Sequence, residues 1–158
     1  MEVKHQESEN RPVATNRKAS FDYSLERTFQ AGIVLQGSEI KSLRARNLSL
    51  GDGYVQERNG ELWLLGVHIA PYEKSDSFEQ SDPVRPRKLL LHRKEINQIL
   101  SRIKEKGYTL IPTKVYIERG RAKVEVALAK GKKQYDKRET IQKRDAERAI
   151  RRAIKEDN

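Results

Sequence analysis

Basic side chains at close spacing are the residues of this chain best suited to bind an anion. Lys41 and Arg44 lie three residues apart in GSEIKSLR (37–44), so a helix there would place both cations on one side. The run RPRKLLLHRK (85–94) carries five more cations and no acid. Lys and Arg bind phosphate groups, so both segments favour a phosphate-bearing partner. The alternative is an ordinary solvated surface, because exposure is the usual state of Lys and Arg.

The overall composition favours nucleic acid as that partner. The 158 residues are enough for one domain and carry a formal net charge of +10. Charged residues make up 35% of the chain, against a usual share of about 25%. No apolar run approaches the about 20 residues of a spanning helix, and the N-terminus lacks the apolar core of a signal peptide. We therefore expect a cytoplasmic protein with no membrane partner.

Catalytic and metal-binding patterns are missing from the sequence. The chain has no cysteine, which excludes disulfides, thiolate catalysis and a cysteine zinc site. His5, His68 and His92 have no metal-ligand spacing, and there is no paired-carboxylate motif or glycine-rich phosphate loop. The sequence therefore predicts a binding protein that is not an enzyme and uses no cofactor or metal.

The elements that position the cations follow from the apolar periodicity. Apolar residues alternate from Phe21 to Leu35 with an interruption at Arg27, which predicts one long strand with a bulge there, or two strands. Gly37 should end this strand, and Ser38 should be the N-cap of the helix that carries the first two cations.

The rest of the body alternates between strand patterns and one clear helix. Apolar residues at helical spacing after His92 predict a helix that ends at Gly107. Further strands are predicted from Tyr54 and over 61–69, 109–118 and 121–130, and an exposed loop over 73–84. Several antiparallel strands with few helices favour a mainly β fold, for which an OB-like antiparallel β-barrel with short flanking helices is the best match.

Composition divides the chain into three segments. Residues 1–15 are expected to form a flexible N-terminal arm and residues 16–130 an RNA-binding barrel. Residues 131–158 hold ten Lys or Arg and six acids but few apolar side chains. This basic C-terminal tail has too little apolar surface to fold alone, so we expect disorder in the free protein and a helix on binding. A simple solubilising tail is the alternative.

Four segments carry a family resemblance. They are NRKA (16–19), AGIVLQGSEIKSLR (31–44), DPVRPRKLLLH (82–92) and GKKQYDKR (131–138). Together they resemble the SsrA-binding protein family, SmpB, the protein partner of transfer-messenger RNA. The resemblance spans residues 16–140 in the family's order, which makes chance a poor explanation.

This resemblance implies a non-enzymatic role in ribosome rescue. The body would bind the tRNA-like domain of transfer-messenger RNA, and the complex would enter stalled ribosomes for trans-translation, in which the nascent peptide is tagged for degradation. The tail would occupy the small-subunit decoding centre and the empty mRNA channel. Elongation factor Tu and alanyl-tRNA synthetase would be indirect partners through the RNA, and the protein would be a monomer.

The resemblance also implies two sets of contact residues. Those for the tRNA-like domain are Gln30, Gly32, Lys41, Ser42, Arg44, Lys88, Leu90 and His92. Those for the decoding centre are Gly131, Lys132, Lys133, Tyr135, Asp136, Lys137 and Arg138. Two positions depart from the family, which often has Glu where this chain has Gln30 and Asn where it has His92. Gln30 keeps an acceptor without the charge, and His92 fits either a helix-cap role or an RNA role.

Composition alone leaves one binding alternative open. A basic barrel with a basic tail is also typical of a general OB-fold RNA-binding or ribosomal protein, which needs no special RNA. The two hypotheses differ in their preference for the tRNA-like domain over bulk tRNA or duplex RNA.

Overall fold

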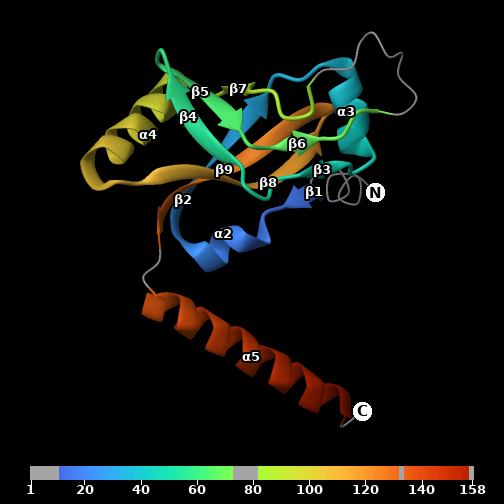
Figure 1. Ribbon diagram of the computed structural model, residues 1–158, viewed down its shortest axis with the longest axis vertical. Coiled ribbons are helices and arrows are strands. Elements are labelled where there is room, and N and C mark those ends of the chain that lie inside the picture. The colour runs from blue at the N-terminus through green and yellow to red at the C-terminus, as the bar shows by residue number, and fades with distance from the viewer. Residues whose placement is uncertain (1–10, 73–81, 132–133, 157–158) are drawn as a thin grey trace.

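The structure, a computed structural model, describes residues 11–72, 82–131 and 134–156. It is mainly β, with helices around one large antiparallel sheet (Figure 1). The strands are β1 (Pro12–Thr15), β2 (Tyr23–Ile33), β3 (Leu48–Ser49), β4 (Tyr54–Arg58), β5 (Glu61–Leu65), β6 (His68–Ile69), β7 (Arg87–Leu90), β8 (Thr109–Glu118) and β9 (Arg121–Gly131). The helices are α2 (Arg17–Asp22), α3 (Gly37–Arg44), α4 (Arg93–Lys106) and α5 (Gln134–Glu156). The predicted class, mainly β with antiparallel strands and flanking helices, is confirmed.

Seven strands form the main sheet in the order β1-β8-β4-β5-β7-β2-β9, and β8 pairs with β9 as well. All of these pairings are antiparallel. A separate two-stranded ribbon joins β3 and β6. The β2–β9 ladder joins distant parts of the chain, because it places Gln30 directly opposite Glu125.

The apolar core lies on alternate residues of these strands. Phe29 and Ala31 of β2 and Val124 of β9 are buried, and Ile99 of α4 closes the same core. Because neighbouring side chains of a strand point to opposite faces, the residues between these buried ones face outward. The outward face of β2, β7 and β9 is therefore the part of the sheet that can carry a binding site.

The first half of β2 departs from the sequence prediction at one point. The predicted bulge is confirmed, since the β2–β9 register shifts between Leu25 and Arg27. The predicted start of the strand at Phe21 is wrong, because Phe21 lies in α2. The neighbouring Ala19 is 2% exposed and packs with Ile111 and Ala129, so burial of this small residue favours a helical turn over continued strand.

The two predicted helices differ in how well their ends were predicted. The helix after His92 is confirmed as α4, whose C-cap Gly107 adopts a left-handed φ of 66°. The predicted N-cap Ser38 is wrong, because α3 begins at Gly37 with Gln36 as its N-cap. The Glu39 carboxylate accepts the Gln36 backbone N–H at 2.9 Å, which satisfies the donor at the helix start.

The end of the predicted N-terminal arm joins the sheet. Residues 12–15, which the sequence assigned to a flexible arm, form β1 and pair with β8. Val13 and Ala14 pack against the core, which explains why this short apolar stretch joins the sheet. Residues 1–10 of the predicted arm, and 73–81 of the predicted loop, lie outside the described residues.

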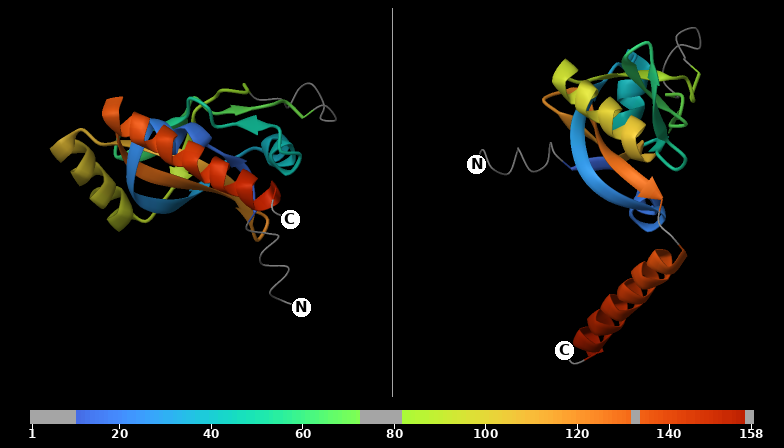
Figure 2. Two further views of the ribbon diagram at one scale, coloured as in Figure 1. Left: turned by 90° about the horizontal axis from the view of Figure 1, so that it is seen from below. Right: turned by 90° about the vertical axis from the view of Figure 1, so that its left-hand side faces the viewer.

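The C-terminal segment forms one long helix, α5, which projects from the body beside α2 (Figures 1 and 2). Arg144 of α5 donates from Nη2 to Ser20 Oγ at 3.2 Å, and its guanidinium lies 5.9 Å from the centre of the Phe21 ring. This segment is helical in the structure, whereas disorder of the free tail and its folding into a helix on binding stay predictions. No helix in the described part of the chain has the length and apolar character needed to cross a membrane.

Candidate RNA-binding site

One residue from each of four strands forms a row across the outward face of the sheet. Tyr116 of β8 lies opposite Lys123 of β9, Lys123 lies opposite Gly32 of β2, and Gly32 lies opposite Leu90 of β7. Gly32 has no side chain, so the row dips between a cation and an exposed leucine. A Cβ at Gly32 would come within 3.3 Å of the Leu90 Cβ, so any larger residue would crowd this dip.

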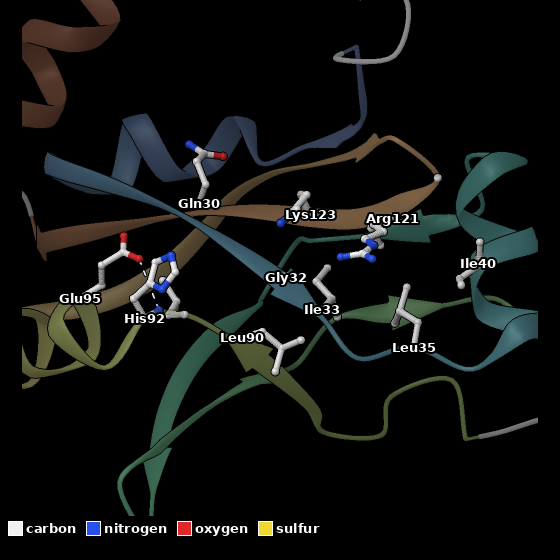
Figure 3. Close-up of a pocket in the computed structure, with 13 residues that line it drawn as sticks. Gln30, Gly32, Ile33, Leu35, Ile40, Leu90, His92, Glu95, Arg121 and Lys123 are labelled. Atoms are coloured by element: carbon white, nitrogen blue, oxygen red, sulfur yellow. Dashed lines mark hydrogen bonds between the residues drawn. The ribbon is translucent and has the colours of Figure 1, made fainter.

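The dip is the centre of a hollow (Figure 3). Its lining residues are Gln30, Gly32, Ile33, Leu35, Ile40, Leu90, Leu91, His92, Glu95, Gly120, Arg121, Ala122 and Lys123. Apolar side chains and polar side chains thus share one concave surface, which suits a flat ring with charged substituents. Leu90 is 53% exposed here, although it follows the fully packed Leu89.

The structure brings together half of the residues that the resemblance assigned to the tRNA-like domain. Gln30, Gly32, Leu90 and His92 all line the hollow. The side chain of His92 lies at the start of α4, where its backbone N–H donates to Glu95 Oε1 at 3.4 Å. His92 therefore lies at the N-terminus of α4 and lines the hollow at the same time, so a helix-cap role and an RNA-binding role are compatible.

Lys88 and Arg44 lie outside the lining of the hollow, where Arg44 is exposed and Lys88 is half-buried. Lys88 is two residues before Leu90 on the same strand, so it shares the outward face. Its ammonium pairs with Glu61 at 3.0 Å, and both side chains are about two-fifths exposed. Such a surface pair contributes little stability, so Lys88 can exchange Glu61 for a phosphate at low cost.

The other predicted residues of α3 have different surroundings. Lys41 is exposed, and its ammonium lies 5.7 Å from the centre of the Tyr72 ring. Ser42 is 1% exposed, and its hydroxyl donates to the Ala70 carbonyl at 2.6 Å. In this structure Ser42 therefore fixes the position of α3, while Lys41 faces solvent.

A buried ionic cluster ties α3 to β7. Arg87 is 0% exposed, and its Nε donates to Glu39 Oε2 at 2.7 Å. Arg87 also donates to the carbonyls of Val67 and Pro83, at 2.9 and 3.0 Å. Arg85 donates to the other Glu39 oxygen. Two of the five cations in the 85–94 run therefore form ion pairs within the protein. The sequence did not indicate this structural role.

The carboxyl of Glu39 stays ionised within this cluster. Burial raises its pKa, but hydrogen bonds from Arg85, the Gln36 backbone and Arg87 outweigh that effect, so the pKa lies below its ordinary value. An ionised Glu39 holds α3 at a fixed distance from β7, and therefore holds Ile40 at the edge of the hollow.

A second network fixes the amide of Gln30. The Tyr116 hydroxyl donates to Gln30 Oε1, and Gln30 Nε2 donates to Glu125 Oε1 at 3.2 Å. Thr113 Oγ1 donates to the other Glu125 oxygen at 2.6 Å. Burial and the carboxylates of Glu118 and Glu125 raise the pKa of Tyr116, which keeps its hydroxyl protonated as a donor. A glutamate at position 30 would instead face the Glu125 carboxylate, so glutamine suits this chain.

Two cations of the hollow, Arg121 and Lys123, were missed in the sequence. Their alternation with Ala122 and Val124 already placed them on the outward face of the last predicted strand. What the pattern could not supply was the register, which sets Lys123 opposite Gly32 rather than opposite another residue of β2.

Gly131, the first of the residues predicted to contact the decoding centre, lies at the other end of β2 from the hollow. Gly131 pairs with Tyr23, nine residues along the strand from Gly32, which is about 30 Å in an extended chain. Arg138 is exposed on α5. The backbone of Tyr135, Asp136 and Lys137 lies in the first turn of α5, whereas Lys132 and Lys133 lie outside the described residues.

Comparisons with known proteins give a consistent result. The family model described as SmpB protein matches residues 13–156. An SsrA-binding protein from Roseiflexus castenholzii is 57% identical over 146 residues, 92% of each chain. Another from Caldicellulosiruptor bescii is 53% identical over 156 residues, 99% of this chain and 98% of that protein.

A solved structure is similar as well. One chain of a structure described as "tmRNA-SmpB: a journey to the center of the bacterial ribosome" is 46% identical. It superposes with a TM-score of 0.65 and covers 78% of this chain and 87% of its own length. The family model and the relatives both span nearly the whole chain, and the chain therefore belongs to the SmpB family of SsrA-binding proteins.

Proposed function

We propose that this protein binds the tRNA-like domain of transfer-messenger RNA and delivers it to stalled ribosomes for trans-translation, without catalysing a reaction itself. The observation that carries the proposal is the row of Tyr116, Lys123, Gly32 and Leu90 across the sheet. The names of the SsrA-binding relatives and the tmRNA–SmpB description of the solved neighbour support the choice of RNA.

The proposed contact surface combines three kinds of interaction. The apolar side chains of the hollow suit an unstacked base, and Leu90 is exposed enough to contact one. Lys41, Arg44 and Lys88 suit phosphates around the hollow. Gln30 and His92 supply hydrogen-bonding groups at its edge. Ser42 contributes by holding α3 in place.

We infer an OB-like barrel as the scaffold of this surface. The strands β8, β4, β5, β7, β2 and β9 each pair with two neighbours from this same set, as strands of a closed barrel do. In a barrel of this kind the outward face of a few strands is the usual nucleic-acid surface.

We assign the three parts of the chain different roles. Residues 16–130 bind the tRNA-like domain, preceded by an arm over residues 1–15 of which β1 joins the sheet. The tail, residues 131–158, would be disordered in the free protein and helical in the decoding centre and mRNA channel, with the contacts at 131–138 named above. The protein would act in the cytoplasm as a monomer, and would meet elongation factor Tu and alanyl-tRNA synthetase only through the RNA.

A competition experiment tests this function. The Kd of the full-length protein for the isolated tRNA-like domain is measured at several salt concentrations, with bulk tRNA and duplex RNA as competitors. We expect a preference of about tenfold or more, about 1.4 kcal/mol, for the tRNA-like domain. Equal affinity for all three RNAs would reject the proposal and leave the general RNA-binding alternative.

Removing one surface cation that contacts a phosphate should reduce the salt dependence of RNA binding by the contribution of one contact. Arg44→Gln and Lys88→Gln should each weaken binding, and each should reduce the slope of log K against log salt by about 0.7 to 0.9 if it removes one phosphate contact. The Glu61→Gln variant is the control for Lys88→Gln, because it breaks the same ion pair without removing the cation. If Lys88→Gln leaves the slope of log K against log salt unchanged, Lys88 does not contact a phosphate of the RNA.

Tyr116 should affect RNA binding only through Gln30. Tyr116→Phe removes the hydroxyl that orients the Gln30 amide, and the loss of one hydrogen bond should weaken binding by about 2- to 10-fold. In a Gln30→Ala background the same change should have no further effect, which a purely structural role would not produce. Tyr54→Phe, at an exposed ring of β4, is the matched control. Equal losses in both backgrounds would contradict the coupling.

A further inference from the structure

The β8–β9 hairpin next to the hollow carries an unusual concentration of cations. Arg119 and Arg121 are exposed, and Lys123 is half-buried. These three residues and Glu118, all of them charged, line a second depression. Arg121 and Lys123 line the hollow as well, so the two depressions share one wall. Figure 3 shows both side chains between the hairpin and Gly32.

Arg119, Arg121 and Lys123 have no ionic partners within the described part of the chain. The ion pairs found there involve other basic side chains, namely Arg85, Arg87, Lys88, Arg102 and Lys114. Glu118 is the one acid that lines the second depression, against three cations. The depression therefore has a net positive charge and suits an anion.

Arg119 occupies a backbone position that does not favour arginine. It has a φ of 50° and precedes Gly120, with a φ of 75°, in the two-residue turn between Glu118 and Arg121. The β4–β5 hairpin has the same turn geometry, with Asn59 at 52° and Gly60 at 77°. Asn-Gly is the preferred pair for such a turn, since Asn adopts a positive φ readily. An arginine at this position of the β8–β9 turn is therefore better explained by its charge than by the turn.

We propose that the β8–β9 hairpin binds backbone phosphates of the RNA strand whose base enters the hollow, with Arg119 and Arg121 as the phosphate contacts. The hollow can accept a ring because apolar side chains such as Leu90 form part of its lining, and the adjoining depression can accept a phosphate because only charged residues line it. A nucleotide has the same division between an apolar ring and an anionic backbone. This inference rests on the proposed function and adds the segment that RNA would present, an unpaired nucleotide in a loop.

The variant Arg119→Asn tests this proposal without endangering the fold. It removes one charge and introduces the residue that the equivalent turn of β4–β5 already has, so the melting temperature should stay the same or rise. The Kd of the full-length protein for the tRNA-like domain should increase severalfold at low salt. The salt slope should fall by about 0.7 to 0.9, and by about twice that amount in Arg119→Asn/Arg121→Gln.

The control is Lys104→Gln, which removes one exposed cation from α4 about 13 Å along the helix from Glu95. It should leave the slope unchanged. If the wild type prefers the tRNA-like domain but Arg119→Asn behaves like Lys104→Gln, the hairpin contact is overturned and the proposed function stands. If the wild type shows no such preference, the proposed function and the hairpin contact both fail.

Discussion

Replacing Glu39 by glutamine should lower the free energy of unfolding by about 3 to 5 kcal/mol. Glu39 is 4% exposed and holds the guanidinium of Arg87, which is 0% exposed. The amide that Glu39→Gln introduces would be neutral, so the buried charge of Arg87 would lose its counterion. The amide nitrogen is a donor, so one of the two oxygens that now accept from Arg85 and Arg87 would be replaced by a group that cannot accept. Urea unfolding at pH 7, followed by circular dichroism, measures the loss.

The matched control for this variant is Glu61→Gln. Glu61 makes an ion pair of ordinary length with Lys88, but both side chains are about two-fifths exposed. Exposed pairs contribute at most about 1 kcal/mol, so this variant should unfold at nearly the wild-type urea concentration. If Glu39→Gln were no more destabilising than Glu61→Gln, the buried cluster would not be what fixes α3 against β7.

The same cluster predicts a pH dependence with a definite sign. Because hydrogen bonds hold the pKa of Glu39 below its ordinary value, the ionised carboxylate stabilises the folded state above about pH 4.3, the usual pKa of an unfolded Glu. This stability is lost as the pH falls through the lower pKa of the folded state. Glu39→Gln should lack this part of the acid destabilisation, which unfolding curves between about pH 3 and pH 7 would show.

Truncation after Lys130 should abolish peptide tagging on stalled ribosomes while leaving binding of the tRNA-like domain largely intact. The hollow is lined by residues between Gln30 and Lys123, so removal of residues 131–158 takes none of them away. The tail contacts α2 through Arg144, at the opposite end of β2 from Gly32. Tagging is measured in a reconstituted translation system with a message that lacks a stop codon, and binding by the Kd for the RNA.

A body variant should show the converse behaviour and serves as the control. Leu90→Glu places a negative charge on a side chain that is 53% exposed, so the fold should persist. The carboxylate should disfavour the base in the hollow and repel the phosphates next to it. Its RNA affinity should fall, and tagging should fall in proportion to binding. If the truncated protein still tagged peptides, the assignment of the tail to the decoding centre would be wrong.

Local patterns in the sequence were sufficient to predict much of the scaffold. The alternation around Arg27 predicted β2 with its bulge, and the spacing after His92 predicted α4 with its end at Gly107. These features depend on residues within a few positions of one another, which a single sequence displays directly. Where a long-range contact decided the local structure, as at Ala19 in α2, the prediction was wrong.

The residues of the candidate site were also predictable only in part from the sequence. The sequence by itself determined which residues are basic, apolar or small, and the alternation along two predicted strands placed Gln30 and Lys123 on their outward faces. It predicted no strand for Leu90, which lies in β7. Only the tertiary structure decided that Lys123 lies opposite Gly32, and that Arg85 and Arg87 form ion pairs with Glu39. The reason is that strand register and buried ion pairs join segments separated by tens of residues, and alternation within one strand is compatible with several registers of its partner.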